Sequence, residues 1–244
     1  MKKKSIDVCF SPALFHLYDA SESIVVVIDV LRATSSICIA FEHGVRSIVP
    51  VSKVEESSAY RAKGYLVGAE RKGEMVEGFD LGNSPFSYMD PKVKDRDIAL
   101  TTTNGTQAIA IARNAFQIAI GSFLNQDALC NWLKQQNRNV ILLCSGWKNS
   151  FNFEDTLFAG AVVHKLLDSF ELTDHRDSAL AAMQLYHLAK DDLYGFLEQS
   201  SHRKRLEKLQ IEDDIVFCLT PNQTDCIPVM VGDAIYNLNV LQSM

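Results

Sequence analysis

The sequence predicts an α/β fold with a mostly parallel sheet, helices on both faces of the sheet, and a helical insertion in the C-terminal third. Over the first two thirds of the chain, short apolar runs alternate with segments of helical spacing, which is typical of βαβ units. Residues 24–28 are a continuous β-branched run, as expected of a strand buried on both faces. Residues 178–209 have a purely helical pattern that is rich in charge.

The first group of elements starts at that β-branched strand. Residues 33–43 follow at helical spacing, with Ile37, Ala40 and Phe41 on one side and Gly44 as a stop. In chain order, the pattern then predicts a strand over 47–51, a charged helix over 53–63 and a strand that begins over 65–67.

The same alternation returns in the middle of the chain. The pattern predicts strands over 98–100, 118–120 and 140–144, with helices over 105–113, 125–136 and 153–168. In such sheets, ligands bind outside the carboxyl ends of the strands, so the polar residues that follow each strand are the candidates for a site.

The C-terminal third is predicted to begin with the helical stretch and to close with two strands, over 215–219 and 227–231. We interpret residues 178–209 as an insertion rather than a small subdomain, because the closing strands can rejoin the sheet. No Gly/Ser-rich linker divides the chain, so residues 1–244 are expected to form a single α/β domain.

Composition excludes several classes of protein. The 244 residues are 47% hydrophobic and 22% charged, which is typical of a soluble globular protein and not of a disordered or fibrous one. Acidic residues outnumber basic residues by 30 to 24, giving a formal net charge of −6. We therefore expect no nucleic-acid partner bound through bulk charge, although a local basic pocket for a small anion remains open.

The N-terminus and the cysteines favour a cytoplasmic location. Residues 1–4 resemble the start of a signal peptide, but Asp7 interrupts the apolar stretch, and no apolar run approaches the ~20 residues of a membrane span. We therefore expect no membrane association. Six scattered cysteines without a C-x-x-C pair indicate buried free thiols in a reducing compartment.

The first polar stretch at a strand end covers residues 29–36. Asp29 ends a very apolar strand and is expected at the binding crevice, and Arg32 adds planar donors that suit phosphate or sulfonate. The alternative is that Asp29 and Thr34 only cap the following helix.

The second polar stretch, residues 68–73 and 78–85, holds four glycines and a proline, which predicts tight turns. Arg71 and Lys72 could close on an anion there. The alternative is a surface loop with solvated charges.

The third polar stretch is Thr101-Thr102-Thr103-Asn104-Gly105-Thr106, which leads from a strand into a helix. Backbone N–H groups at such a helix start bind anions. The spacing and lysine of a Walker A loop are missing, and the alternative is an N-cap with an Asn-Gly turn.

The fourth polar stretch places Glu154 and Asp155 in the first turn of a long helix. The helix dipole alone favours carboxylates there. They could equally hold Mg²⁺, which prefers a few carboxylates with phosphate oxygens and water, and Asp29 could complete that set. Acids for a divalent metal beside cations for an anion suit phosphoryl chemistry.

Four motifs in this order resemble those of the 2-phosphosulfolactate phosphatase family. They are Asp29-Val30-Leu31-Arg32-Ala33-Thr34-Ser35, Gly78-Phe79-Asp80-Leu81-Gly82-Asn83-Ser84-Pro85, Thr101-Thr102-Thr103-Asn104-Gly105-Thr106, and Phe153-Glu154-Asp155-Thr156 with Ala159-Gly160. The C-terminal part resembles the family through His202, Arg205-Leu206, Asp214-Ile215 and Asp225 with Pro228.

The resemblance implies Mg²⁺-dependent hydrolysis of (2R)-2-phospho-3-sulfolactate to 3-sulfolactate and phosphate, which serves coenzyme M biosynthesis in the family. The partner is then a small anionic phospho-acid. Motifs and resemblance together give three sets of site residues. The sets are Asp29, Arg32 and Asn104 for catalysis; Arg71, Thr103, Gly105, Thr106, His202 and Arg205 for substrate binding; and Asp29, Glu154 and Asp155 for Mg²⁺. We expect Arg32, Arg71 or Arg205 to contact the carboxylate or sulfonate of the substrate.

Other interpretations stay open at this point. The chain could be a non-catalytic binding protein for phosphorylated or sulfonated metabolites, or a phosphatase for another phospho-acid. A haloacid-dehalogenase-type phosphatase also carries an aspartate after its first strand, but Leu31 stands where the second aspartate of its D-x-D-x-T pattern belongs. Whether Asp29 attacks phosphorus or binds the metal, and whether the chain forms a homo-oligomer, stays open too.

Overall fold

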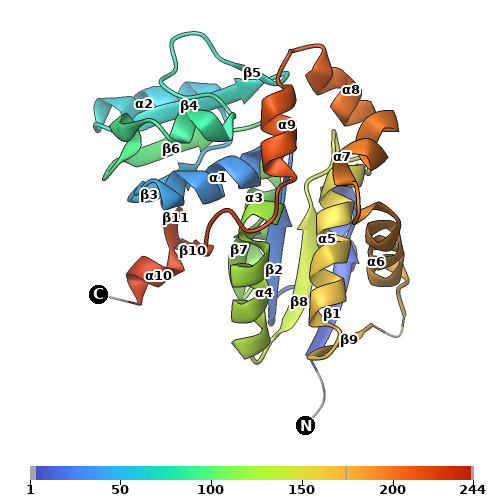
Figure 1. Ribbon diagram of the computed structural model, residues 1–244. Helices are drawn as coiled ribbons and strands as arrows, with labels where there is room; N and C mark the ends of the chain where they lie inside the picture. Colours follow the sequence, from blue (N-terminus) through green and yellow to red (C-terminus); the bar gives the residue numbers. More distant parts are fainter. Residues whose placement is uncertain (1–3, 174, 243–244) are drawn as a thin grey trace.

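The computed structural model describes residues 4–173 and 175–242, in which an 11-stranded sheet runs in the order β5-β4-β6-β3-β11-β10-β7-β2-β8-β1-β9 (Figure 1). The strands are β1 (Lys4–Cys9), β2 (Ser23–Ile28), β3 (Ser47–Pro50), β4 (Leu66–Arg71), β5 (Glu74–Met75), β6 (Asp97–Thr101), β7 (Gln117–Gly121), β8 (Asn139–Cys144), β9 (Phe170–Leu172), β10 (Pro228–Val231) and β11 (Ala234–Asn237).

Two parallel groups of strands make up most of the sheet. One group is β4-β6-β3 and the other is β7-β2-β8-β1-β9. The hairpin of β10 and β11 lies between them and pairs antiparallel with β7 on one side and with β3 on the other. In Figure 1 the two groups run in clearly different directions, with the β4-β6-β3 group at the upper left. The predicted mostly parallel α/β sheet is confirmed.

Helices cover both faces of this sheet. They are α1 (Ala33–Glu42), α2 (Ser57–Ala62), α3 (Gly105–Ile111), α4 (Gln126–Gln135), α5 (Phe153–Leu166), α6 (Ser178–Ala189), α7 (Leu193–Phe196), α8 (Ser201–Glu207), α9 (Glu212–Cys218) and α10 (Leu238–Leu241), with short 3₁₀ turns between some of them.

The central strand β2 shows why the β-branched run predicted a strand buried on both faces. Ile24, Val26 and Ile28 belong to the core formed with α4 and α5, whereas Val25 and Val27 belong to the core formed with α1 and α3. All five side chains are at most 1% exposed. Because successive strand residues point to opposite faces, an unbroken apolar run is what a strand between two helical layers requires.

The C-terminal third contains one wrong prediction. Residues 215–219 were expected to form a strand, but Glu212–Cys218 forms α9. Ile215 and Cys218, three residues apart, are fully buried, while Val216 between them is 50% exposed. Three acids, Glu212, Asp213 and Asp214, occupy the first turn of this helix, where the helix dipole favours them.

The rest of the C-terminal third agrees with the predicted pattern. Helices occupy most of 178–209, and β10 forms within the predicted 227–231. The strand β11 was not predicted, nor was β1, whose Asp7 was expected to interrupt an apolar run. Asp7 is instead a buried carboxylate that is paired with Arg176 at 2.9 Å and accepts a hydrogen bond from Ser178.

The structure also bears on the predicted thiols and on membrane-spanning segments. All six cysteines are free and buried, as predicted. Among the described residues, no helix combines the length and the apolar character needed to cross a lipid bilayer.

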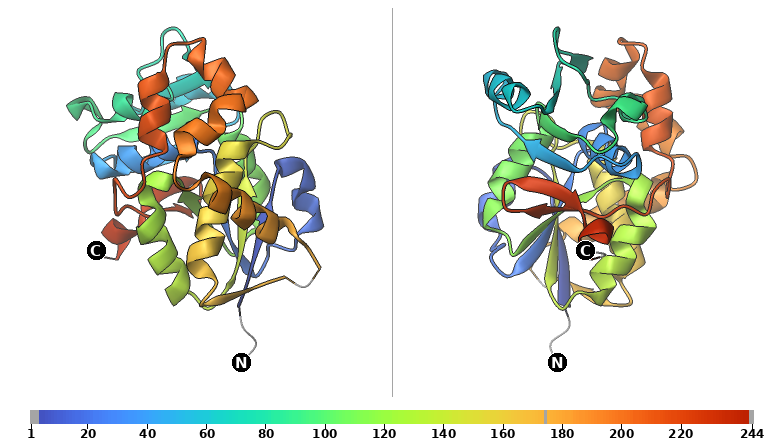
Figure 2. Two further views of the ribbon diagram at one scale, coloured as in Figure 1. Left: turned by 45° about the vertical axis from the view of Figure 1, so that its right-hand side comes forward. Right: turned by 90° about the vertical axis from the view of Figure 1, so that its left-hand side faces the viewer.

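Helices α8 and α9 lie over one end of the molecule. In both views of Figure 2 these orange-red helices lie beside the teal β4–β5 segment. A contact supports this placement, because a Cβ atom built on Gly73 would come within 2.5 Å of Leu209. The β4–β5 turn and the α8–α9 segment thus enclose the carboxyl ends of several strands.

Candidate active site

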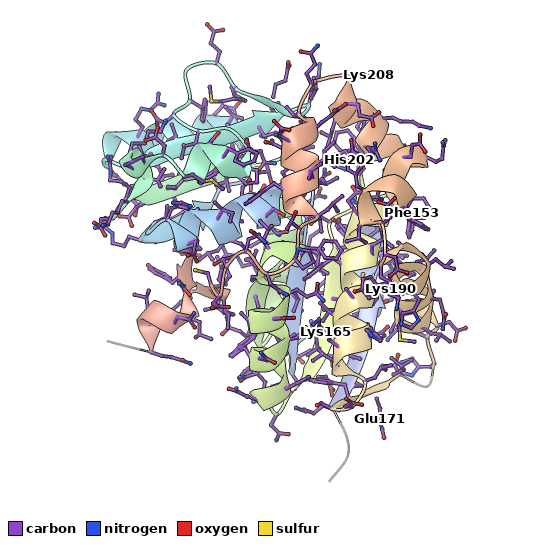
Figure 3. The ribbon with its side chains drawn as sticks, in the orientation of Figure 1. Phe153, Lys165, Glu171, Lys190, His202 and Lys208 are labelled. Carbon is purple, nitrogen blue, oxygen red and sulfur yellow. The ribbon has the colours of Figure 1, made fainter. Side chains whose placement is uncertain are left out.

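A cavity of about 290 Å³ lies at this end of the molecule. Asp29, Asn104 and Trp147 line it from the segments that follow β2, β6 and β8. His202 and Arg205 line it from α8. In Figure 3, His202 and Phe153, the first residue of α5, lie toward the same upper part of the molecule. Chain segments that are far apart in the sequence therefore meet where the fold predicts a ligand site.

Asp29 is the carboxylate that this cavity receives from the central strand. It is 8% exposed, and its Oδ1 accepts only a long contact of 3.4 Å from the Ala33 N–H. Burial raises the pKa of Asp29 to about 6, although the nearby His202 opposes the shift. A Cβ on Gly105 would lie 2.9 Å from Oδ2, so glycine at this position leaves room for the carboxylate.

Asp155 lies near Asp29, whose charge acts on it, but does not line the cavity. Its Oδ1 accepts a hydrogen bond from the Val30 N–H at 2.8 Å, and its Oδ2 accepts from the Gly146 N–H at 3.1 Å and from Asn152 Nδ2 at 2.9 Å. Burial raises the pKa of Asp155 well above its ordinary value, and the charge of Asp29 adds to the shift. Asp155 thus ties the loops after β2 and β8 to α5, a structural role that the sequence did not predict.

This role predicts the effect of replacing Asp155 with asparagine. The amide NH₂ cannot accept a hydrogen bond, so at least one buried backbone N–H loses its partner, which costs about 1–3 kcal/mol of unfolding free energy. Urea unfolding of Asp155→Asn and of the native protein measures the difference. Equal unfolding free energies would contradict the structural role.

Glu154 forms a buried pair with His202. The Glu154 Oε1 contacts His202 Nδ1 and also accepts a hydrogen bond from Asn152 at 2.9 Å. Burial alone would raise the pKa of Glu154, but the facing His202 outweighs it and leaves that pKa below its ordinary value. Glu154 is fully buried and does not line the cavity, and its Oε2 has no hydrogen-bond partner among the described residues.

Arg32 lines the cavity, but its guanidinium is largely engaged within the protein. Nη1 forms an ion pair with Asp214 of α9, and Nη2 donates to the Gly73 carbonyl at 2.6 Å. Ser84 donates to the other oxygen of Asp214 at 2.8 Å. Arg32 is 4% exposed, so it clamps α9 and the β4–β5 turn to the start of α1.

Of the two cations that the sequence suggested for an anion, Arg71 and Lys72, the cavity wall contains Lys72. Arg71, predicted to bind substrate, lies outside the cavity wall and donates to the Glu70 carbonyl at 2.7 Å and to Thr101 Oγ1 at 3.2 Å. Lys72 lines the cavity instead. Lys72 and Gly73 form the two-residue turn between β4 and β5, both with positive φ (59° and 89°), which is the backbone of a tight hairpin turn. The turn places Lys72 in the cavity wall.

The threonine-rich turn before α3 is stabilised by hydrogen bonds of its own hydroxyl groups. The Thr103 hydroxyl donates to Glu70 Oε2 at 3.1 Å, and the Thr106 hydroxyl donates to the Thr102 carbonyl at 2.8 Å. Of residues 101–106, the cavity wall contains Asn104. Both hydroxyls are thus engaged within the protein and shape the turn, and substrate binding by the backbone N–H groups of this helix start stays a prediction. Gly105 serves by leaving space beside Asp29, and it does not line the cavity.

Arg205 and Trp147 form a stacked pair in the cavity wall. The Arg205 guanidinium carbon lies 4.3 Å from the centre of the Trp147 ring, and that ring also lies 5.7 Å from the His202 ring. Sequence reasoning predicted Arg205 and His202 but missed Trp147, and it missed Lys148, which also lines the cavity. The position of both residues directly after the Cys144-Ser145-Gly146 strand end was the available signal.

Fewer carboxylates are free to bind Mg²⁺ than the three that the sequence suggested. Among the described residues, no three His, Cys, Asp or Glu side chains are grouped so that they could hold a metal ion by themselves. Asp29 nevertheless faces the cavity, and Glu154 keeps an unpartnered buried oxygen. Mg²⁺ is commonly held by one or two carboxylates together with phosphate oxygens and water, so these two residues fit such an ion. Asp155 is the weakest of the three candidates because both its oxygens accept hydrogen bonds.

Comparison with known proteins gives one consistent result. The family model described as 2-phosphosulpholactate phosphatase matches residues 9–233. A probable 2-phosphosulfolactate phosphatase of Pseudothermotoga lettingae is 39% identical over 229 residues, covering 93% of this chain and 96% of the relative. Proteins with the same description from Caldanaerobacter subterraneus subsp. tengcongensis (39% over 216 residues) and Thermotoga petrophila (40% over 207) match 86% and 85% of this chain and 88% of each relative.

Proposed function

Because the chain belongs to the 2-phosphosulfolactate phosphatase family of phosphoric monoester hydrolases, we propose that it hydrolyses (2R)-2-phospho-3-sulfolactate to 3-sulfolactate and phosphate. The observation that carries the proposal is the cavity wall, where the weakly bonded carboxylate of Asp29 stands among the cationic side chains of Lys72, Lys148 and Arg205. These three cations form no ion pair with any described carboxylate, so they remain available to a strongly anionic substrate.

The substrate phosphate is expected beside Asp29. No described residue accepts a hydrogen bond from the backbone N–H of Asn104 or Gly105, which lie at the start of α3 next to this carboxylate. Free N–H groups at a helix start suit a phosphate oxygen. Asp29 either attacks phosphorus, forming an aspartyl-phosphate that water then hydrolyses, or orients a water molecule that attacks phosphorus directly. In both cases the bond between phosphorus and the C2 oxygen breaks.

His202 is the group best placed to give a proton to the departing oxygen. Glu154 holds the imidazole ring through Nδ1, and no described residue bonds to Nε2. Because His202 lines the cavity, Nε2 is the ring atom left for the leaving group.

We propose that Mg²⁺ is the cofactor and that Asp29 and Glu154 are its protein ligands. When bound, the ion would neutralise charge on the phosphoryl oxygens. The mutual repulsion of the buried carboxylates supports this choice: besides burial, the charge of Glu154 contributes to raising the pKa of Asp29, and the charges of Asp29 and Glu154 contribute to raising that of Asp155. A cation among these groups relieves that repulsion.

Phosphate release from a panel of phospho-acids tests both proposals. We expect release from 2-phosphosulfolactate to fall at least about tenfold in EDTA, which is ~1.4 kcal/mol of barrier, and to recover with added Mg²⁺. Full activity in metal-free enzyme would contradict the metal proposal. No release from any member of the panel would contradict the phosphatase proposal and favour a binding protein.

We also propose the cellular setting that the family resemblance implies. The six free buried thiols suit a reducing cytoplasm. The product 3-sulfolactate would then enter coenzyme M biosynthesis.

A further inference from the structure

Arg205 differs from the other arginines near the cavity because its donors are not satisfied by the protein. Its Nη2 is buried and has no hydrogen-bond partner among the described residues. Its Nη1 makes one long contact of 3.5 Å with the Ser201 hydroxyl. By contrast, Arg32 is bonded to Asp214 and to Gly73, and Arg71 is bonded to Glu70 and Thr101.

The environment of Arg205 is apolar on one side and open on the other. The Trp147 ring stacks on the guanidinium at 4.3 Å, and a second cavity of about 330 Å³ shares Trp147, His202 and Arg205 as wall residues. A buried donor without a partner costs free energy unless a ligand supplies the acceptor. Burial also lowers the pKa of this guanidinium below its ordinary value.

We infer that Arg205, held in place by Trp147, binds the sulfonate of the substrate; this inference rests on the proposed phosphatase function. A guanidinium is weakly hydrated and offers planar pairs of donors. A sulfonate is a diffuse anion with three acceptor oxygens, and it suits such a partly dehydrated fork. The compact ammonium groups of Lys72 and Lys148 remain for the phosphate and carboxylate.

Trp147 is a positioning residue in this arrangement. Its ring covers one face of the guanidinium, which leaves the other face and the edge with the N–H groups for a ligand. Stacking of this kind stabilises the Arg205 guanidinium and restricts the rotamers of that side chain. Trp147 begins a tight turn that is closed by two backbone hydrogen bonds between Trp147 and Ser150. These bonds fix the backbone that carries the ring.

The test compares three substrates that differ in one anionic group. They are 2-phosphosulfolactate, 2-phospholactate, which lacks the sulfonate, and 2-phosphooxyethanesulfonate, which lacks the carboxylate. In Arg205→Gln we expect kcat/KM to fall about 10- to 100-fold for the two sulfonates, as for a lost charge-assisted hydrogen bond, and to stay within about threefold for 2-phospholactate.

A matched control lies on the same helix. Lys204→Gln removes an equal charge one residue away, from an exposed side chain that bonds only to Gln199 and does not line the cavity. Its activity on all three substrates should match the native enzyme. Trp147→Leu should lower the ratio of sulfonate to 2-phospholactate activity about 3- to 10-fold, and Trp147→Phe should restore part of it, since phenylalanine can still stack. A purely structural role of Trp147 would lower all three activities equally.

Calorimetry of 3-sulfolactate and lactate separates this inference from the proposed function. Weaker binding of 3-sulfolactate to Arg205→Gln, with no phosphate release by the native enzyme, would overturn the phosphatase proposal and leave the sulfonate site standing. Equal loss on all three substrates would assign Arg205 to the phosphate. Loss confined to 2-phosphosulfolactate and 2-phospholactate would assign it to the carboxylate. Either result, or unchanged activity in Arg205→Gln, overturns the inference.

Discussion

Replacing Asp29 with asparagine is expected to lower kcat about 10³-fold or more, which is ~4 kcal/mol of barrier, while the fold is retained. The side chain faces the cavity and makes only a 3.4 Å contact with the Ala33 N–H, so the fold depends little on its charge. Asparagine has nearly the same shape and still accepts at one oxygen, and a lost cap would cost only ~1 kcal/mol. An amide, however, neither attacks phosphorus nor binds Mg²⁺ as a carboxylate does.

The raised pKa of Asp29 determines how the difference in stability between the native enzyme and Asp29→Asn depends on pH. Because the native carboxyl has a pKa of about 6, above its unfolded value, it contributes most to stability at low pH, and the contribution falls as pH rises through this range. Asparagine does not ionise, so the stability of Asp29→Asn does not fall in this way. The variant should be at least as stable as the native enzyme above pH ~6. Urea unfolding at several pH values and steady-state kinetics measure the two effects separately.

The outcomes divide clearly between a structural and a chemical role. Lower stability with kcat within about threefold of the native value, or ~0.65 kcal/mol, would show that Asp29 only caps α1. A phosphoprotein trapped in the native enzyme and absent from Asp29→Asn would assign Asp29 as the nucleophile. Loss of turnover together with weaker Mg²⁺ binding, without a phosphoprotein, would assign it as a metal ligand.

The elements that the sequence predicted correctly are those whose pattern is local. Residues 24–28 are apolar at every position because helices cover both faces of β2, and no distant residue is needed to interpret them. By contrast, β1 contains Asp7, which is tolerated in a buried strand because Arg176 and Ser178 approach it from far along the chain. The apolar residues 215–218 fit a strand or a helix equally in so short a window, and only packing decides for α9.

The site shows the same division. Asp29 and Arg205 could be predicted because strand ends and basic clusters are visible in the sequence, and both line the cavity. The pairing of Arg32 with Asp214, at a separation of 182 residues, has no local signal. The sequence therefore identified several of the cations near the site and missed Lys148, and it could not show which of them the protein already uses.

The pair between Arg32 and Asp214 leads to the second large expected effect. Asp214→Asn should lower the free energy of unfolding by about 3–5 kcal/mol, because it leaves the Arg32 charge buried without its partner. Arg32 is 4% exposed and Asp214 is 5% exposed, so water compensates little for the lost carboxylate. Urea unfolding measures the change. Since the pair holds α9 against α1, the variant should also lose activity at urea concentrations where the native enzyme keeps it.

Two further variants test this prediction: a double replacement that removes both charges, and a replacement of the neighbouring Ser84 that removes only one hydrogen bond. Arg32→Met combined with Asp214→Leu removes both charges and should be less destabilised than Asp214→Asn alone, because apolar side chains of similar size avoid the buried unpaired charge. Ser84→Ala removes one hydrogen bond to Asp214 and should cost about 1 kcal/mol. If Asp214→Asn costs no more than Ser84→Ala, Arg32 does not depend on Asp214 for its charge. Its guanidinium would then be free for the substrate, as the sequence predicted, and Arg32→Met would lower kcat/KM without a matching loss of stability.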